Sequence, residues 1–448
     1  MVARMSCQVK EKCYICIDLK SFYASVECAD RGLDPFRVNL VVADPERTEK
    51  TICLAITPAM KALGIKNRCR VFEIPEGIEY IKAKPRMKRY MECSTFIYSI
   101  YLRYISAEDI HVYSIDECFI DATPYLSLYD MDSKSFAKML MGEVFKETKI
   151  CATAGIGTNL FLAKVALDVT AKHVRDNIGV LDEGSFKKEL WFHRPITDIW
   201  NIGPGIARRL RKYGVFDLAG VASMKEETLY KEFGKNAEFL IDHAWGQEPC
   251  TMQEIKTYVP KGHTANYGQV LACDYNFEEA RMILREMVDD AVLDLVSNRL
   301  VAERISLAVG YSVPKEFREQ AEAFEAGHGK RFIGRGRYFV VNASRKLAKK
   351  TNSFKSIMEE FDALFAEIVD ASAPIKRLNI SFDGLLPEKY ASVSLFDDIE
   401  DLERERSKQK AILAVKQKFG KNAMLKGTSL KEKATARQRH EQVGGHRA

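Results

Sequence analysis

The sequence contains little of what defines several large classes of protein. It has no run of 18 or more apolar residues, so no transmembrane helix is predicted, and the first 12 residues lack the apolar core of a secretory signal. Only 26 of the 448 residues are glycine and 13 are proline, which excludes collagen-like and low-complexity chains. The eleven cysteines are odd in number and scattered, which favours reduced thiols in a cytosol over a disulfide framework.

Common cofactor and metal signatures are missing as well. There is no G-x-x-x-x-G-K-[ST] phosphate loop, and Gly155-Ile-Gly157 lacks the third glycine of a dinucleotide fingerprint. The eight histidines form no H-E-x-x-H cluster. Cys13 and Cys16 are spaced as C-x-x-C, but no second pair follows at zinc spacing, so we expect both thiols to lie in the core.

The charge is unevenly distributed along the chain. With 68 Lys+Arg and 62 Asp+Glu, the formal net charge is +6. Residues 401–448 hold 13 basic and 5 acidic side chains, a net of +8, so the first 400 residues carry a net of −2. A second block, residues 328–350, has eight basic side chains and no acidic one. Such blocks are often only solvated faces, but they also suit contact with phosphates, because each neutralised phosphate releases counterions.

Length and hydrophobic periodicity indicate several domains of mixed structure. At ~100–200 residues per domain, the length suggests about three. The first 180 residues mix strands and helices, among them a strand at 13–18, a hairpin at 111–121 and a helix at 160–172, and the next part is helical. From 258 onward the pattern predicts β-α-β-β-α-β, a split βαβ domain. Its expected strands are 268–272, 305–311, 337–341 and 378–382, and its expected helices are 277–298 and 353–369.

Carboxylates lie at the ends of two apolar strands. Asp18 ends the first strand, and Asp116-Glu117 form the turn of the hairpin. A single acid at such a place is often only a turn former, but two adjacent acids repel each other unless a cation offsets them. Mg²⁺ prefers carboxylate oxygens shared with substrate phosphates, and two ions ~4 Å apart can hold both oxygens of an in-line phosphoryl displacement. The pattern is therefore compatible with a two-metal site.

Two segments around these acids resemble the palm motifs of the Y-family DNA polymerases. Residues 17–27 (IDLKSFYASVE) are similar to the first motif and residues 114–121 (SIDECFID) to the second, in the same order and at a similar separation. The similarity extends through Gly155-Ile-Gly157, Ala163-Lys164 and Gly203-Pro-Gly205 to the split βαβ domain, and covers nearly the whole chain. Within the family, the chain looks closest to the UmuC-like branch of bacteria and their mobile elements.

The resemblance implies an α/β (α+β multidomain) right-hand fold with a split βαβ little finger. The palm would comprise residues 13–21 and 88–180, the fingers 22–87, a helical thumb with a helix-hairpin-helix 181–252, a linker 253–262, the little finger 263–385 and the tail 386–448. We expect a helix at 400–419 in the tail, and its basic segment would be a tethering arm or a docking site for another protein.

The resemblance also assigns a catalytic centre. Asp18, Asp116 and Glu117 fall on the metal-binding carboxylates and, with the backbone carbonyl of Leu19, would hold two Mg²⁺ ions, for which Mn²⁺ is a substitute. These would lower the barrier to attack by the primer 3′-hydroxyl on the α-phosphate of a dNTP, through positioning and charge neutralisation. Tyr23 matches the steric gate that excludes a ribose 2′-hydroxyl; without the motif, a core aromatic is the favoured interpretation.

Residues of the fingers and palm would contact the incoming nucleotide. The dNTP-binding residues implied by the resemblance are Phe22, Tyr23, Thr57, Lys61 and Lys172. Many relatives have a Tyr where this chain has Pro58, so Thr57 would make the nucleotide contact of that Tyr instead. Lys172 is the best match for the second triphosphate lysine, although its spacing from Lys164 is one residue longer than in some relatives. For either lysine alone, simple solvent exposure is the alternative.

Two basic segments would hold DNA. Residues 202–207 (IGPGIA), followed by four cations, resemble a helix-hairpin-helix, in which glycines permit a tight turn and N–H groups at a helix start face a phosphate. An ordinary αα-turn with a basic face is the alternative. The residues expected to contact DNA are Gly203, Gly205, Arg208 and Arg209 in the thumb and Arg331, Arg335 and Arg337 in the little finger. Such contacts position a duplex without reading its sequence.

A short segment of the tail resembles a docking peptide. Residues 392–396 (SVSLF) are similar to the pentapeptide by which bacterial polymerases bind the sliding clamp, with Leu395 and Phe396 as anchors and Ser392 in place of the usual Gln. The expected partners are thus primer-template DNA, dNTPs and the sliding clamp (beta subunit), while a UmuD-like or RecA partner is left open. We expect a monomer without a membrane segment, in the bacterial cytoplasm and associated with the nucleoid.

The resemblance predicts a template-directed, error-prone translesion DNA polymerase of DNA repair and the SOS response, without a proofreading exonuclease. A nucleotide cyclase on a similar palm is the rival enzyme, but the sequence has no Gly-Gly-acid-Glu-Phe hairpin. A DNA-binding accessory protein with a degenerate palm is the non-enzyme rival, and the three intact carboxylates argue against it.

Overall fold

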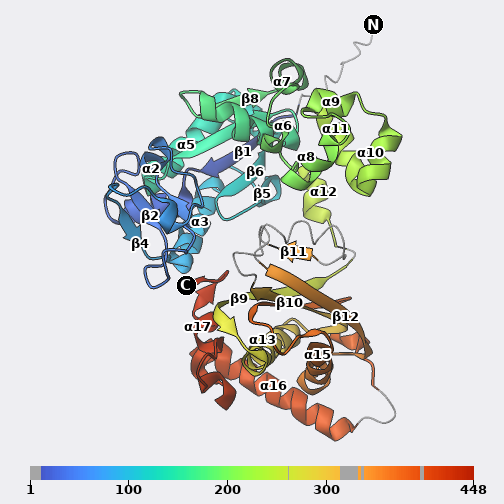
Figure 1. Cartoon of the computed structure of the whole chain (residues 1–448). Helices are drawn as coiled ribbons and strands as arrows, with labels where there is room; N and C mark the ends of the chain where they lie inside the picture. The colour runs from blue at the N-terminus through green and yellow to red at the C-terminus, as the bar shows by residue number, and fades with distance from the viewer. Residues whose placement is uncertain (1–11, 261, 313–330, 334–337, 394–397, 448) are drawn as a thin grey trace. The chain divides into compact units, whose positions relative to one another are not determined.

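The computed structural model describes residues 12–447, apart from 261, 313–330, 334–337 and 394–397 (Figure 1). Two compact units form, one of residues up to Tyr258 with the last three residues, the other of Val259–Gly445. The division falls within the predicted linker 253–262, which also contains most of helix α12 (Met252–Thr257). None of the described helices is long and apolar enough to cross a membrane.

A five-stranded sheet forms the centre of the first unit, in the order β5-β6-β1-β7-β8. Its strands are β1 (Tyr14–Leu19), β5 (Ile110–Val112), β6 (Glu117–Asp121), β7 (Ala152–Gly157) and β8 (Ile178–Leu181). Strand β1 pairs antiparallel with β6 and β7, and β7 pairs parallel with β8. The predicted strand at 13–18 and hairpin at 111–121 are confirmed, whereas β8 is a strand that the periodicity does not predict.

Glycines let a helix lie directly on this sheet. Helices α5 (Ser133–Thr148) and α6 (Leu160–Val165) both pack on β7, whose residues are all buried. A Cβ atom at Gly155 would lie 2.1 Å from the carbonyl oxygen of Ala163, and one at Gly157 would lie 2.3 Å from its nitrogen. Gly155-Ile-Gly157 therefore serves the close approach of helix and strand.

The helix predicted at 160–172 changes geometry along its length. After α6 ends, the chain continues as a π-helix, η3 (Ala166–Thr170), and then as a 3₁₀ turn, Ala171–His173. A Cβ atom at Gly179 on β8 would lie 2.4 Å from the carbonyl oxygen of Ala166, so this segment also lies directly on the sheet. A π-turn closes its hydrogen bond from i to i+5 and thus accommodates one more residue than an α-turn.

The predicted fingers form a small layer around a three-stranded sheet in the order β3-β2-β4. Its elements are α1 (Phe22–Asp30), β2 (Leu40–Val42), β3 (Ala55–Ile56), α2 (Pro58–Ala62) and β4 (Ile81–Ala83), followed by α3 (Met87–Tyr101). Its apolar core includes Val41, Ile56 and Met60. The predicted thumb is helical, with α7 (Glu183–Leu190), α8 (Pro204–Arg211), α9 (Leu218–Ala222), α10 (Glu226–Phe233) and α11 (Ala237–Ala244).

The second unit contains the predicted β-α-β-β-α-β order. Its elements are β9 (Thr264–Tyr275), α13 (Phe277–Ser297), β10 (Leu300–Ser312), β11 (Arg331–Ile333), β12 (Tyr338–Thr351), α15 (Phe354–Ile368), β13 (Ile375–Asp383) and β14 (Leu386–Pro387). The sheet order β11-β12-β10-β13-β9 places β13 between β9 and β10, which α13 connects, so the split βαβ prediction is confirmed. Strand β12 extends ten residues beyond the predicted end at 341.

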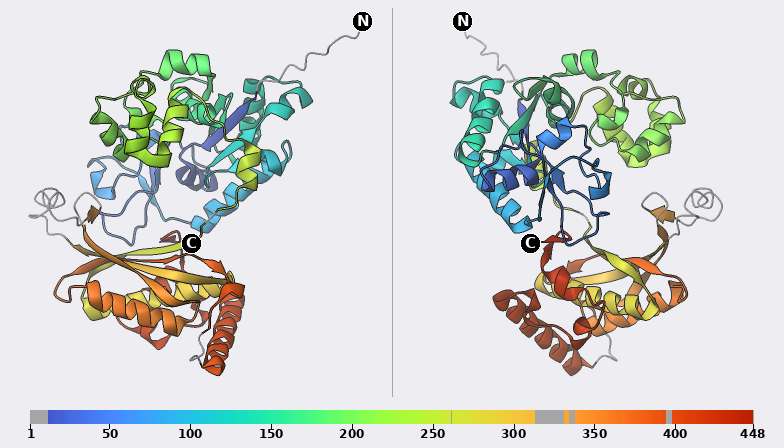
Figure 2. Two further views of the ribbon diagram at one scale, coloured as in Figure 1. Left: turned by 90° about the vertical axis from the view of Figure 1, so that its right-hand side faces the viewer. Right: turned by 60° about the vertical axis from the view of Figure 1, so that its left-hand side comes forward.

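The two faces of this second sheet differ in chemistry. Ile305, Leu307 and Val309 pack with α13 and α15, and Figure 2 shows the helices of this unit on one side of its sheet. Ser306 and Ala308, which alternate with these residues along β10, belong to the opposite face of the sheet. On that face, small and polar residues of neighbouring strands form cross-strand rows. One row is Asn266, Ser381, Ser306 and Ser344, and the next is Gly268, Asn379, Ala308 and Asn342.

The described part of the tail is folded, which corrects the expectation of a tethering arm. Helix α16 (Ile399–Phe419) matches the predicted helix, and both it and α17 (Ala436–His440) pack against α13. The carboxylate of Glu286, buried on α13, accepts hydrogen bonds from the N–H groups of Thr435 and Ala436, both at 3.0 Å. Asp290 pairs with Arg439 at 2.6 Å. Cations of the tail thus neutralise acids of their own unit.

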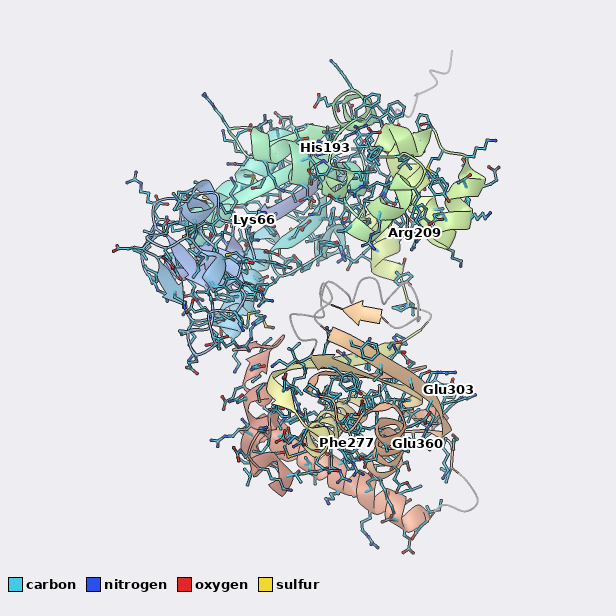
Figure 3. The ribbon with its side chains drawn as sticks, viewed as in Figure 1. Lys66, His193, Arg209, Phe277, Glu303 and Glu360 are labelled. Carbon is cyan, nitrogen blue, oxygen red and sulfur yellow. The ribbon has the colours of Figure 1, made fainter. Side chains whose placement is uncertain are left out.

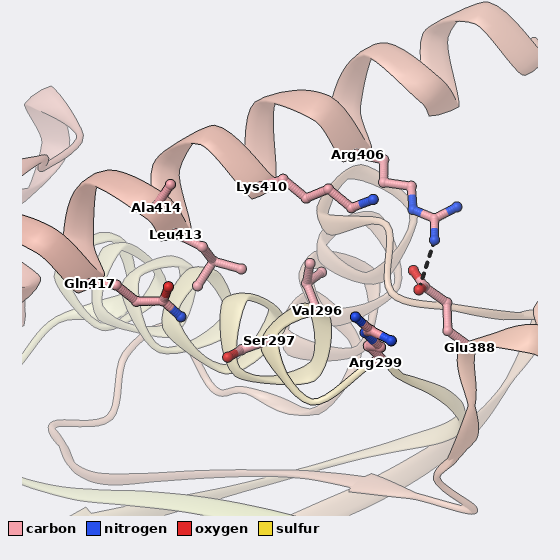
Figure 4. Close-up of a pocket in the computed structure, with 9 residues that line it drawn as sticks. All are labelled: Val296, Ser297, Arg299, Glu388, Arg406, Lys410, Leu413, Ala414 and Gln417. Carbon is pink, nitrogen blue, oxygen red and sulfur yellow. Dashed lines mark ion pairs between the residues drawn. The ribbon is translucent and has the colours of Figure 1, made fainter.

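A groove of about 410 Å³ runs between the end of α13 and α16 (Figure 4). Val296, Leu413 and Ala414 supply apolar lining, and an ion pair of 2.7 Å joins Arg406 to Glu388 at one end. Of the expected site residues that the structure describes, none lines this groove.

The substitution Glu286→Ala tests the attachment of the tail. It removes the acceptor of two backbone N–H groups in a buried place, so we expect the free energy of unfolding to fall by about 1–3 kcal/mol, with the melting temperature several degrees lower. Thermal unfolding of the full chain measures this. Glu403→Ala, on an exposed position of α16, is the matched control. Equal melting temperatures of both variants would contradict the proposed anchor.

Candidate active site

Three carboxylates meet at one end of the central sheet of the first unit. Asp18 on β1 is directly opposite Glu117 on β6, so their side chains lie on the same face of the sheet. Asp116 precedes β6, and its carbonyl oxygen accepts the N–H of Leu19 at 2.9 Å. The Asp116 carboxylate accepts the hydroxyl of Ser114 at 2.7 Å. Pairing of β1 with β6 therefore brings together acids that are about 100 positions apart in the sequence.

The electrostatics of this cluster favour a positive partner. The pKa of Asp18 is raised from 3.8 to about 7, first by burial and then by the negative charges of Asp116 and Glu117. Each of these causes favours the neutral acid, so an approaching cation would restore the ionised form.

A buried lysine stabilises Glu117 from the helix side. Lys164 on α6 is 7% exposed, and its Nζ lies 2.7 Å from Glu117 and 3.1 Å from Asp168. Burial opposes its charge, yet Asp168 and Glu117 hold the pKa of Lys164 above its ordinary value. The thiol of Cys16 donates to the same Glu117 oxygen at 3.1 Å. Cys16 and Cys13 are both buried, as expected from the lack of a second cysteine pair.

The donor set fits a hard divalent cation that shares its ligands with a substrate. Among the described residues, no three His, Cys, Asp or Glu side chains form a ready metal cage. Mg²⁺ is usually held by one or two carboxylates together with waters and substrate phosphates, so a closed cage is not required. The clustered carboxylates, with the raised pKa of Asp18, supply oxygen ligands and the negative charge for it.

Three lysines gather beside the carboxylates. Lys61 keeps contact with solvent, but its pKa is lowered, first by burial and then by the positive charges of Lys172 and Lys20, while Asp18 acts in the opposite direction. Lys20, which the sequence did not single out, donates from Nζ to Asn177 at 2.5 Å. The π-helix lies between Lys164 and Lys172 and accommodates the additional residue of their spacing.

The predicted gate residue lies against a second tyrosine. The ring of Tyr23 on α1 stacks on Tyr90 of α3, with centroids 4.5 Å apart and planes 17° apart. The pKa of Tyr23 is raised, first by burial and then by the charge of Asp116, which reflects its nearness to the carboxylates. Tyr90 has no signal of its own in the sequence and was not expected here.

The two other residues expected to contact the nucleotide, Phe22 and Thr57, are buried. Phe22 is 2% exposed, so its ring belongs to the core. Thr57 is fully buried, and its hydroxyl donates to the carbonyl of Val38 at 2.8 Å and accepts the N–H of Leu40 at 3.2 Å. These contacts explain both residues without a nucleotide.

The helix-hairpin-helix segment differs in detail from expectation. The left-handed residue of its turn is Asn201 (φ 67°), whereas Gly203 is extended (φ −81°) and begins α8 as its N-cap. A Cβ atom built at Gly203 or Gly205 would meet nothing within 4 Å outside the neighbouring residues, so the surface here is open to a close approach. Arg208 is exposed. Arg209, labelled in Figure 3, pairs with Glu232 at 2.7 Å and lies over the ring of Phe233.

Several expected contacts cannot be placed. Arg335, Arg337, Leu395 and Phe396 lie outside the described residues, and Arg331 is described only as part of the strand β11.

Comparison with known proteins gives consistent matches over the whole chain. Residues 17–168 match the family described as impB/mucB/samB, and residues 262–395 match its C-terminal domain. A putative UV-damage repair protein, UvrX, of Bacillus subtilis is 28% identical over 444 residues, covering 98% of this chain and 99% of the relative. DNA polymerase IV 2 of the same organism is 27% identical over 446 residues, covering 98% and 99%.

A solved structure shows the same fold. It is a Y-family DNA polymerase chimera of Dbh and Dpo4, with a TM-score of 0.60 at 18% identity, covering 84% of this chain and 99% of that chain. The two family matches together span more than half of the sequence, and the relatives match over nearly their full length. The chain therefore belongs to the impB/mucB/samB family of Y-family DNA polymerases, and it is a DNA-directed DNA polymerase with a mixed α/β multidomain fold.

Proposed function

We propose that this polymerase adds deoxynucleotides to primer 3′-ends by a two-metal mechanism, in error-prone translesion synthesis during DNA repair and the SOS response. The observation that carries the proposal is the juxtaposition of Asp18, Asp116 and Glu117, with Lys61 close enough to Asp18 to respond to its charge. A full-length relative named as a UV-damage repair protein supports the role in repair.

In the proposed site, Asp18, Asp116, Glu117 and the backbone carbonyl of Leu19 hold two Mg²⁺ ions. Bound there, such ions supply charge neutralisation and a more acidic attacking hydroxyl. Lys164 and the thiol of Cys16 hold one oxygen of Glu117 in place, which leaves its other oxygen for coordination. The carboxylates are thus oriented before a substrate arrives, which reduces the cost of reorganisation during the reaction.

We assign the triphosphate to the lysines beside this cluster. Lys61 and Lys172 are the two expected residues, and the positive charges of Lys172 and Lys20 disfavour the charged form of Lys61 by repulsion. An anionic triphosphate would relieve that repulsion, because an opposite charge favours the ionised form of each lysine. Tyr23, half-buried and close to Asp116, is assigned as the steric gate whose ring would clash with a ribose 2′-hydroxyl.

Two surfaces are assigned to the primer-template duplex. At the start of α8, Gly203 and Gly205 leave space for a phosphate, and Arg208 adds an exposed cation. Arg209 is left out because Glu232 already neutralises it. In the second unit, the face of small and polar residues, opposite the face on which the described helices α13 and α15 pack, suits a DNA backbone. The expected cations Arg331, Arg335 and Arg337 would add phosphate contacts.

The remaining assignments follow the family. We propose the palm, fingers, thumb, little finger and tail at the boundaries given above, with the small fingers leaving an open, damage-tolerant site. The sliding clamp would bind Leu395 and Phe396, and the enzyme would act as a monomer in the bacterial cytoplasm; whether a UmuD-like or RecA partner takes part is left open.

The substitution Asp116→Asn tests the metal assignment. It removes one negative charge from the cluster, so primer extension with Mg²⁺ and dNTPs should fall by at least roughly 10²–10³-fold, while affinity for primed DNA is nearly unchanged. Asp121→Asn is the matched control, because Asp121 lies at the other end of β6 and its hydrogen bond from Thr123 N–H needs only a carbonyl oxygen. Extension by Asp116→Asn at the parental rate would refute the two-metal assignment.

The lysine assignment predicts a change in nucleotide affinity. Lys61→Ala and Lys172→Ala should each raise the KM for dNTP about tenfold, equivalent to the loss of ~1.4 kcal/mol of binding, because each removes a charge beside the triphosphate. Steady-state single-nucleotide incorporation measures this. Lys66→Ala is the control, since Lys66 is an exposed lysine of the same region (Figure 3). A KM unchanged in both variants would remove these lysines from the site.

A further inference from the structure

The steric-gate tyrosine is supported by a residue whose own position is locked. Tyr90 is fully buried, and its ring lies flat against that of Tyr23. Stacked aromatic rings in van der Waals contact restrict each other's side-chain rotation. Whatever holds Tyr90 therefore also limits where the ring of Tyr23 can move.

The hydroxyl of Tyr90 is held by a buried charge. It donates to Oε1 of Glu27 at 2.7 Å, and the Glu27 side chain is 0% exposed. Arg86 donates from Nε to the same oxygen at 2.9 Å, and Arg31 pairs with the other oxygen. A buried carboxylate is tolerated only when it is paired and hydrogen-bonded, and bonds to a charged acceptor are the stronger kind.

Glu27 and Tyr23 belong to the same face of α1. They are four residues apart, which places them one helical turn from each other. Tyr90 on α3 thus contacts α1 at two points, with its ring on Tyr23 and its hydroxyl on Glu27. Asp30, at the end of α1, pairs with Arg86 at 2.8 Å and Arg89 at 2.7 Å, which ties the same two helices together again.

We propose that Glu27 and Tyr90 are positioning residues for sugar discrimination: through the hydrogen bond between them they fix the Tyr23 ring in the place where it excludes a 2′-hydroxyl. The inference rests on the proposed role of Tyr23 as the gate. A role in packing alone would require only the ring of Tyr90, whereas positioning requires its hydroxyl and the charge of Glu27. The substitution Tyr90→Phe, which removes only the hydroxyl, should therefore weaken sugar discrimination if Tyr90 positions Tyr23, and should leave it unchanged if Tyr90 only packs against Tyr23.

The experiment compares incorporation of a dNTP and its matching rNTP as the ratio of kcat/KM values. Tyr23→Ala should lower this ratio at least 30-fold. Tyr90→Phe and Glu27→Gln should each lower it about three- to tenfold, mainly by increasing rNTP incorporation, with dNTP incorporation changed less than twofold. Tyr98→Phe, on the same helix, is the control for loss of a hydroxyl and should leave the ratio unchanged.

The double variant Tyr23→Ala/Tyr90→Phe separates positioning from packing. If Tyr90 acts through Tyr23, its substitution has no further effect on the ratio once the Tyr23 ring is absent, so the two effects are not additive. Additive effects, or an unchanged ratio in Tyr90→Phe, would overturn the inference while leaving the gate intact. A parental ratio in Tyr23→Ala would instead overturn the gate assignment and the inference with it. Tyr90→Phe keeps the ring, so the comparison stands even if Glu27→Gln fails to fold.

Discussion

The first unit depends on holding three carboxylates close together against their mutual repulsion. The repulsion is visible in Asp18, whose pKa is raised to about 7 by burial and by its two acidic neighbours. Lys164 offsets part of it, but only if α6 comes close enough for a 2.7 Å contact with Glu117. That approach needs positions without side chains on the part of β7 beneath the helix, which Gly155 and Gly157 supply. The two glycines of β7 are thus explained by the need to bring Lys164 of α6 close to Glu117.

The distribution of charge along the chain is likewise better explained by local ion pairs than by the net charge. A net of +6 describes the sequence poorly, because the tail alone holds +8. Several cations of the tail, however, form ion pairs with acids of their own unit: Arg439 with Asp290, Lys426 with Asp289 and Lys433 with Glu279. Part of the positive charge of the tail is therefore neutralised within its own unit. The cations beside the carboxylate cluster are few and local, and short-range contacts in a low dielectric outweigh screened long-range charge.

Local pattern was sufficient for much of the fold, whereas the acidic cluster was only compatible with a metal site until the resemblance to the polymerase motifs assigned it. Asp18 and Asp116-Glu117 end apolar strands, and the β-α-β-β-α-β order followed from periodicity. The sequence was insufficient where a partner is distant along the chain. Tyr90 and Glu27 are 63 positions apart, and a single lysine such as Lys20 looks like any exposed lysine. The left-handed position before α8 could not be predicted from the sequence, because Asn201 adopts it whereas Gly203 is extended.

Helix α1 shows why these distant contacts matter. It follows directly on the strand that carries Asp18, presents Tyr23 in its first turn, and one turn later buries the charge of Glu27 against α3. A shift of the α1 backbone at Tyr23 would also move the strand end that carries Asp18 or the Glu27 carboxylate that three donors surround. Both movements expose or unpair a buried charge, which is costly. The position of Tyr23 is thereby coupled to Asp18 before the start of α1 and to the ion-paired Glu27 one helical turn later.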